Sequence, residues 1–154
     1  MKIKILSVGT KAPQWIRAGF EEYAKRMPRE MPLALVEIAP PKHGAEADKF
    51  IQIEDAKMMS QLESDDWVVA LDERGKQVTS TQLAGKLDRW RMQGGNVVFV
   101  IGGSDGLGES VLARSNEQIA LSALTFPHYM VRVILAEMIY RAWTIVIGHP
   151  YHRA

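Results

Sequence analysis

The sequence predicts a single α/β domain built on a parallel β-sheet. Short apolar runs of strand length alternate with longer segments that have helical spacing. Some of these runs, such as Trp67–Leu71 and Asn96–Ile101, are apolar at nearly every position, so helices should cover both faces of the sheet. The 154 residues suffice for one hydrophobic core, and no repeat or linker divides them. We therefore expect one domain over residues 1–154.

Prolines and glycines bound the elements expected in the first half of the chain. A helical stretch begins at Pro13, after the Gly9-Thr10 turn. Pro28 and Pro32 mark its end. A run of charged residues, Asp72–Lys76, is interpreted as a loop. The expected elements are a strand at Ile3–Val8, a helix at Pro13–Arg26, a strand at Leu33–Ile38, a helix at Glu46–Leu62 and a strand at Trp67–Leu71.

A capping signal and a glycine pair bound the next helix. Thr79 and Gln82 have the spacing of a capping box, in which each side chain accepts a backbone N–H of the other residue. The helix should run to about Met92 and end at Gly94-Gly95. The remaining expected elements are a strand at Asn96–Ile101, a short helix after the glycine-rich segment that follows it, a strand at Ile119–Ala123 and a long helix at Val131–Ile147.

The composition excludes several classes of protein. There is no cysteine, which excludes disulfides and cysteine-bound metals. The N-terminal apolar run is short and interrupted by Lys4, so it is interpreted as a strand and not as a signal peptide. No window approaches the roughly 18 apolar residues of a membrane helix. We expect a cytoplasmic protein with no membrane partner.

Charge is distributed unevenly along a chain whose net charge is +1. Residues 1–31 carry seven Lys/Arg and three Asp/Glu, whereas residues 32–78 carry five and ten. The basic N-terminal third is compatible with an RNA phosphate backbone. Solvated helix faces explain the same pattern equally well.

A glycine-rich segment, 101–108, follows an apolar strand and is the first candidate binding loop. It lacks the Gly-Lys-Ser/Thr of a P-loop, and its glycine spacing does not match the dinucleotide-binding motif. A tight turn is one interpretation of Gly102-Gly103. The other, which we favour, is a ligand loop, because sites in open α/β sheets lie at the carboxyl ends of strands.

The segment Leu121–His128 leads from a strand into a helix, and Pro127 disfavours helical geometry at Phe126. Its small and apolar residues suit the wall of an adenine pocket, although an ordinary strand-to-helix connection has the same composition.

The segment Val131–Ile147 is apolar almost all round, with Arg132, Glu137, Tyr140, Arg141 and Thr144 as the exceptions. A helix with so little polar surface is buried on most sides. It is either a central core helix or part of a dimer interface, which we favour, and Ile139 lies midway along it.

The chain ends in a cluster of chemically useful side chains. His149 and residues 151–153 bring together imidazoles, a tyrosine ring and an arginine. Tyrosine stacks on bases and arginine binds phosphate, so this tail suits RNA. A frayed, inert end is the alternative. Two histidines with no obvious third ligand are a weak metal signal, and no metal is expected.

Several motifs, in order along the whole chain, resemble the RlmH family of the SPOUT superfamily. They are Val8-Gly9-Thr10-Lys11, Leu71-Asp72 with Gly75-Lys76, Ile101-Gly102-Gly103 with Gly106, Leu121–Thr125 with Pro127-His128, and Tyr140-Arg141-Ala142 leading to Pro150-Tyr151-His152-Arg153. The resemblance implies a homodimer with a C-terminal trefoil knot that uses S-adenosylmethionine. It also implies methylation of N3 of a pseudouridine in 23S rRNA, on the assembled ribosome.

The resemblance also implies the residues that contact the methyl donor and the RNA. The donor contacts it assigns are Leu71, Gly102, Leu121, Ser122, Ala123, Leu124, Thr125 and Phe126. Ser104-Asp105 departs from the Pro-Glu of some relatives, so contacts by the side chains at 104 and 105 do not carry over.

The expected catalytic residues are His152, Tyr151, Arg153 and Arg141. His152 is the candidate base for the N3 proton, because imidazole exchanges protons near neutral pH. Tyr151 would stack on or orient the target base, and Arg153 and Arg141 would bind phosphate or the imide anion. The alternative function is a non-catalytic module that binds the ribosome or its rRNA. A nucleotide-binding phosphotransferase is disfavoured because the P-loop lysine is missing.

Overall fold

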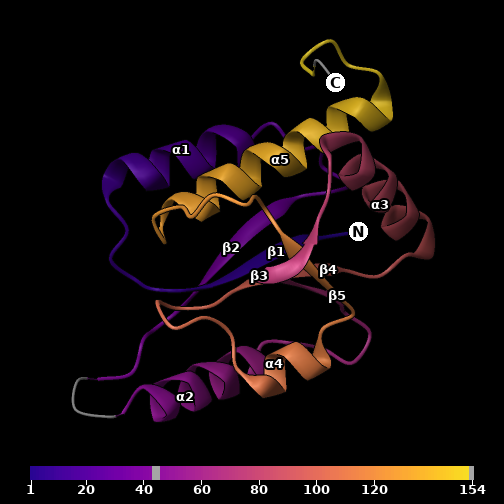
Figure 1. Cartoon of the computed structure of the whole chain (residues 1–154). Helices are drawn as coiled ribbons and strands as arrows, with labels where there is room; N and C mark the ends of the chain where they lie inside the picture. Colours follow the sequence, from indigo (N-terminus) through magenta and orange to yellow (C-terminus); the bar gives the residue numbers. More distant parts are fainter. Residues whose placement is uncertain (43–45, 153–154) are drawn as a thin grey trace.

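A five-stranded parallel sheet forms the centre of the computed structural model, which describes residues 1–42 and 46–152 (Figure 1). The strand order is β2-β1-β4-β3-β5, and every neighbouring pair is parallel. The elements are β1 (Ile3–Val8), α1 (Gln14–Ala24), β2 (Leu33–Ile38), α2 (Ala47–Ser60), β3 (Trp67–Gln77), α3 (Ser80–Gln93), β4 (Val97–Ile101), α4 (Glu109–Arg114), β5 (Glu117–Ala120) and α5 (Met130–Ile147). The predicted fold class and the identity of every predicted element are confirmed.

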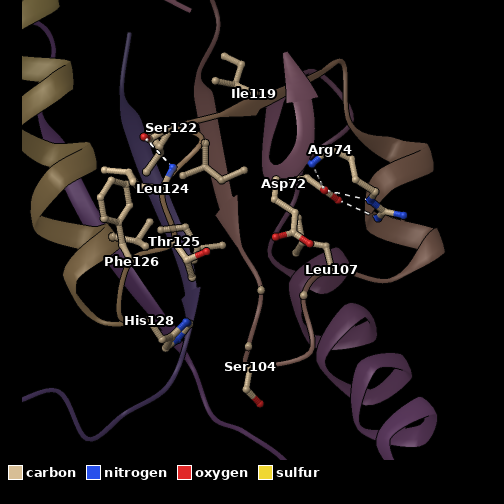
Figure 2. A pocket seen from close by; sticks show the side chains of 18 of the residues that line it. Asp72, Arg74, Ser104, Leu107, Ile119, Ser122, Leu124, Thr125, Phe126 and His128 are labelled. Atoms are coloured by element: carbon tan, nitrogen blue, oxygen red, sulfur yellow. Dashed lines mark hydrogen bonds and ion pairs between the residues drawn. The ribbon is translucent and has the colours of Figure 1, made fainter. Parts of the chain in front are cut away.

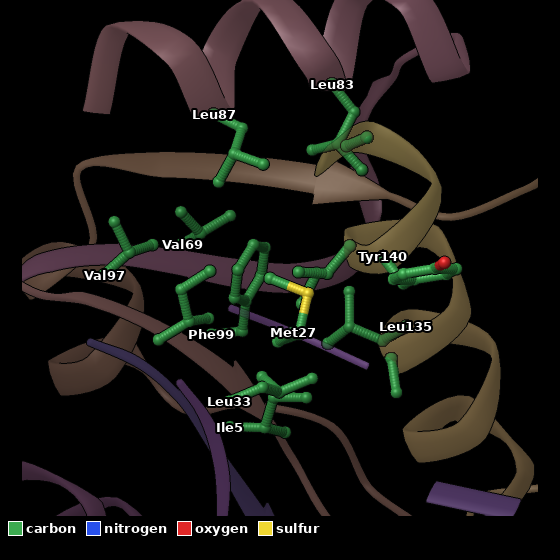
Figure 3. Close-up of a cluster of buried hydrophobic side chains, with 14 of the residues drawn as sticks. Ile5, Met27, Leu33, Val69, Leu83, Leu87, Val97, Phe99, Leu135 and Tyr140 are labelled. Carbon is green, nitrogen blue, oxygen red and sulfur yellow. The ribbon is translucent and has the colours of Figure 1, made fainter. Parts of the chain in front are cut away.

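Helices cover both faces of the sheet, as the fully apolar strands predicted. Figure 1 shows α1, α5 and α3 on one face and α2 and α4 on the other. Figure 3 shows the larger core cluster, where Phe99 of β4 and Val69 of β3 meet Leu135 of α5 and Leu87 of α3. All five residues of β4 are buried. The sheet is therefore a rigid support for the loops at its ends.

The capping box predicted at the start of α3 is present. Thr79 Oγ1 accepts the Gln82 backbone N–H at 3.1 Å, and Gln82 Oε1 accepts the Thr79 N–H at 2.9 Å. The helix ends at Gly94, whose φ of 72° suits a residue without a side chain.

Strand β3 differs from its prediction, because it runs to Gln77 and not to Leu71. Leu71 and Lys76 both align with Ile119 of β5, so residues 72–75 leave the ladder as a bulge and the pairing then resumes. The predicted loop is thus an excursion within a strand.

Strand β5 differs from its prediction at both ends, because it begins at Glu117 and ends at Ala120, not at Ala123. The Glu117 carboxylate accepts the indole N–H of Trp67 at 2.8 Å and that of Trp90 at 3.1 Å, and it pairs with Lys86. A charged residue can begin this strand because three donors satisfy it.

Helix α5 packs against both α1 and α3 and is a core helix on one side. Ile139, expected at an interface, is only 2% exposed within its own subunit. Arg132, which interrupts the apolar pattern of the sequence, is 1% exposed. Met130 and Ile134 of the same helix are not fully buried and belong to neither core cluster. Along the described parts of the chain, no helix has the length and hydrophobicity needed to cross a membrane.

Candidate functional site

A cavity of about 1070 Å³ opens at the carboxyl ends of β3, β4 and β5 (Figure 2). Its walls come from the β3 bulge, the loop after β4 and the segment between β5 and α5. The residues that line it are 71–74, 77, 101–107, 119, 121–126, 128 and 131. All eight predicted donor contacts, Leu71, Gly102 and Leu121 through Phe126, are among them. Its size and position are those of a ligand site in an open α/β sheet.

The glycine-rich segment forms one wall as a closed turn. Gly103 and Gly106 form an isolated bridge, and the Gly106 N–H donates to the Gly103 carbonyl at 3.0 Å. A Cβ at Gly102 would lie 2.5 Å from the Gly106 carbonyl oxygen, so a side chain at Gly102 would force the turn open. The tight-turn interpretation of Gly102-Gly103 is therefore confirmed, and the turn lines the cavity, while its role as a ligand loop stays a prediction.

Asp55 of α2 caps the start of α4, directly after this turn. Its carboxylate is buried and accepts the N–H groups of Gly108 at 2.9 Å and Val111 at 3.3 Å. These groups belong to the first turn of α4, which otherwise has no side-chain cap. Sequence analysis missed Asp55, because a contact between residues 53 positions apart leaves no local signal.

The segment after β5 forms the opposite wall and begins with a side-chain turn. The Leu124 N–H donates to Ser122 Oγ at 3.0 Å, which directs the chain across the end of the sheet. The Leu124 side chain is largely exposed, and Figure 2 shows Ser122, Thr125 and Phe126 across the cavity from Leu107. The loop and the segment together enclose the space between them.

A buried polar cluster joins the same segment to β1. The His128 Nε2–H donates to the Val8 carbonyl at 2.5 Å. The Arg132 guanidinium donates to the Gly9 carbonyl at 2.8 Å and to Glu37 at 2.8 Å. Gly9 has a φ of 120° and lies against the ring of Tyr129, where a Cβ would meet the hydroxyl at 2.6 Å. Arg132 is thus buried with its hydrogen bonds satisfied, which the apolar pattern alone did not predict.

Carboxylates make one side of the cavity negative. Asp72, Glu73 and Asp105 line it, and Glu54 lies directly behind Gly103. Burial raises the pKa of the Glu54 carboxyl above its usual value, and the negative charges of Asp105 and Asp55 raise it further. Such a field favours a positively charged ligand.

The C-terminal tail is ordered through Tyr151 by a network on α5. Glu137 Oε1 accepts the Tyr151 hydroxyl at 2.9 Å and two Arg141 N–H groups at 2.6 and 3.0 Å. The Arg141 guanidinium lies 5.2 Å from the centre of the Tyr151 ring, which also packs against Tyr140. Burial, followed by the hydrogen bond to Glu137, raises the pKa of Tyr151 to about 12. The alternative of a frayed end is therefore wrong for the tail up to Tyr151. The Tyr151 hydroxyl keeps its proton at neutral pH.

The structure separates the predicted site residues into two groups. Arg141, Tyr151 and His152 are absent from the cavity lining of the described chain. His152 Nδ1 is buried, and no described residue gives it a hydrogen-bond partner. Arg153 lies outside the described residues. Glu137, which joins Arg141 to Tyr151, appeared in the sequence only as one of the polar exceptions in an apolar helix.

Together the fold and the cavity define a class of protein, an open α/β sheet that binds a ligand between loops at the carboxyl ends of its strands. In residues 1–42 and 46–152 no three metal-ligating side chains come together.

The sequence matches the family model described as "Predicted SPOUT methyltransferase" over residues 1–152. It is 50% identical to the ribosomal RNA large subunit methyltransferase H of Hahella chejuensis and 51% identical to that of Paraburkholderia phytofirmans, over 99% of each chain. The chain belongs to the SPOUT methyltransferase family and, within it, to the RlmH family that its motifs predicted. A solved structure, a probable methylase family protein from Haemophilus influenzae, aligns with a TM-score of 0.55 over 99% of this chain and 70% of the other; at 13% identity it supports the fold alone.

Proposed function

We propose that this chain is an S-adenosylmethionine-dependent rRNA methyltransferase that modifies N3 of a pseudouridine in 23S rRNA on the assembled ribosome. The observation that carries the proposal is the convergence of Leu71, Gly102 and Leu121–Phe126 on one cavity, from three segments far apart in the chain. The names of relatives at 50% identity support the rRNA as substrate. Ribosomes are cytoplasmic, so the protein would act in that compartment.

The cavity suits S-adenosylmethionine in size and charge. Its volume of about 1070 Å³ is ample for a nucleoside with an amino-acid arm. The closed turn at Gly102 presents backbone where a side chain would stand, and Asp105 and Glu73 give the negative field that a sulfonium cation favours. When bound, the donor supplies a methyl group on a positively charged sulfur, which leaves as a neutral thioether.

The protein must hold N3 of the target base in line with that methyl group and remove the N3 proton. Orientation in such reactions supplies effective molarities of about 10⁵ M or more, whereas a general base adds about 10²–10⁴-fold. His152 is the proposed base, because imidazole is the side chain used most often for general-base catalysis, whereas the Tyr151 hydroxyl already donates to Glu137. Tyr151 orients the target base, and Arg153 and Arg141 bind phosphate or the imide anion as the proton leaves.

The working enzyme is proposed to be a homodimer. The tail of the described chain does not line its own cavity, so a second copy would bring the tail of one subunit to the donor of the other. The part of α5 that carries Met130 and Ile134 is incompletely buried and supports the α5 interface that the sequence analysis favoured. The trefoil knot of the SPOUT superfamily stays a prediction for this chain.

Replacing Ile134 by glutamate is expected to shift the dimer to monomers at micromolar concentration. Ile134 is half-buried and belongs to neither core cluster, so the charge should disturb an interface more than the fold. A charge at Ile139 would not separate loss of the interface from loss of the fold, because Ile139 is buried within the chain. Sedimentation velocity measures the result, with Met92→Glu on the exposed end of α3 as the control. A wild-type protein that sediments as a monomer would contradict the dimer.

Methyl transfer from labelled donor tests the proposed function directly. Free 23S rRNA, isolated large subunits and whole ribosomes lacking the modification should be compared as substrates, and the methylated nucleoside identified by mass spectrometry. We expect incorporation at a single pseudouridine, fastest on whole ribosomes. Tight ribosome binding without incorporation on any substrate would instead favour the non-catalytic module.

A further inference from the structure

The β3 bulge, residues 72–75, stands at the rim of the cavity and carries an arginine (Figure 2). The bulge closes tightly at its end, because a Cβ at Gly75 would lie 2.8 Å from the backbone of Gln118 and Ile119. Its geometry is thereby fixed by the neighbouring strand, and the residues before Gly75 are displayed from a rigid support.

Asp72 fixes the direction of Arg74 through a paired interaction. Asp72 Oδ1 accepts the Arg74 backbone N–H at 2.8 Å and its Nε–H at 3.1 Å, and Oδ2 accepts Nη2–H at 2.9 Å. The hydrogen bond from the Arg74 side chain holds the pKa of Asp72 below its usual value. The Asp72 side chain is 7% exposed whereas that of Arg74 is 71% exposed. One edge of the guanidinium is therefore held, and Nη1 takes no part in these bonds.

The charges around the cavity make this arginine distinctive. Of the residues that line the cavity in the described chain, Arg74 is the only Lys or Arg, beside the carboxylates of Asp72, Glu73 and Asp105. That negative field suits a cationic donor but repels a polyanion such as RNA. An RNA whose base reaches into the cavity must bring its backbone phosphates across this rim.

We propose that Arg74 binds a backbone phosphate of the RNA substrate at the rim of the donor cavity, with Asp72 as the positioning residue for its guanidinium. This proposal rests on the proposed function and names a contact that neither the tail nor the donor loops supply. Arginine offers paired donors that match phosphate geometry, and a guanidinium already held along one edge loses less freedom on binding. The geometry adds one positive contact where the cavity wall is otherwise negative.

The test is an Arg74→Gln variant, with Arg91→Gln as the matched control. Arg91 also pairs with a nearby aspartate, Asp88, and is 48% exposed, but it lies on α3 away from the cavity. The Arg74 backbone N–H still donates to the Asp72 carboxylate in Arg74→Gln, and the Arg91–Asp88 pair is exposed on both sides, so both variants should fold. Donor affinity is measured by calorimetry, and affinity for unmodified ribosomes by equilibrium binding over a series of salt concentrations.

We expect Arg74→Gln to weaken ribosome binding about tenfold, as one lost charge-assisted contact would, with donor affinity unchanged. The slope of log affinity against log salt should fall by roughly 0.7–0.9, the value for one phosphate contact. Arg74→Lys should restore the slope and part of the affinity, because it keeps the charge without the paired geometry. Arg91→Gln should change neither quantity.

Three results would overturn the proposal. Weaker donor binding with unchanged ribosome binding would make Arg74 a donor contact. Equal losses of ribosome affinity in the Arg74 and Arg91 variants would show that only the overall charge matters. Unchanged ribosome affinity in Arg74→Gln would show that Arg74 does not bind the RNA. A wild-type protein that neither binds nor methylates ribosomes would instead contradict the proposed function itself, so the two failures are distinguishable.

Discussion

Deleting residues 151–154 is expected to abolish methyl transfer to the ribosome while donor binding stays near the wild-type value. The deletion removes the proposed base and the ring that orients the target, whereas none of the removed residues that the structure describes lines the donor cavity. It also removes the contact of Tyr151 with Glu137, so some loss of thermal stability is expected and activity must be measured well below the unfolding temperature.

Replacing His152 alone by alanine is the sharper form of this experiment. The rate should fall about 10²–10⁴-fold, the usual contribution of one general base, with smaller changes in ribosome affinity. His149→Ala is the comparison variant, since the His149 ring accepts the Tyr151 N–H at 3.1 Å, so its loss disturbs the tail without removing the proposed base and should cost less activity. If the tail-deleted protein methylated ribosomes at a near-normal rate, the tail would have no catalytic role.

Replacing Gly102 by alanine is expected to reduce donor affinity sharply in a folded protein. The added Cβ would lie 2.5 Å from the Gly106 carbonyl oxygen, which must move and so open the turn that forms one wall of the cavity. Overlap with rigid backbone cannot be relieved by rotating a side chain. Calorimetry with S-adenosylmethionine measures the loss, and circular dichroism checks the fold.

Gly85→Ala provides the control for that substitution. Gly85 lies within α3, where the nearest atom to an added Cβ is Arg89 Nη1 at 4.0 Å. This variant should bind the donor normally and be slightly more stable, because alanine favours a helix. Unchanged donor affinity in folded Gly102→Ala would remove the glycine turn from the donor site.

Much of the fold could be predicted because its signals are local. The apolar runs at Ile3–Val8 and Leu33–Ile38 match their strands residue for residue, and the Thr79–Gln82 spacing located the start of α3. The predictions erred where a partner far along the chain decides the outcome. Residues 72–77 belong to β3 only because β5 pairs with them again after the bulge, and Glu117 can begin β5 only because Trp67, Trp90 and Lys86 satisfy its carboxylate.

The candidate site shows the same division. Its donor residues were named from motifs, and they converge because the carboxyl ends of parallel strands meet at one edge of a sheet. The sequence did not predict the long-range contacts made by Asp55, Arg132 and Glu137. Each contact joins residues whose spacing in the sequence gives no signal.

The sequence by itself determined the fold class through its hydrophobic periodicity, and the order of its motifs determined the family. The family resemblance also named eight of the residues that line the cavity. Only the tertiary structure decided that the described tail lies outside the cavity of its own subunit, that Arg132 is buried on the carbonyl of Gly9, and that Arg74 faces outward from a negative rim. The reason is physical. The burial of a side chain, its hydrogen-bond partners and its orientation depend on which segments, far apart in the sequence, come into contact. Those contacts form only when the chain folds.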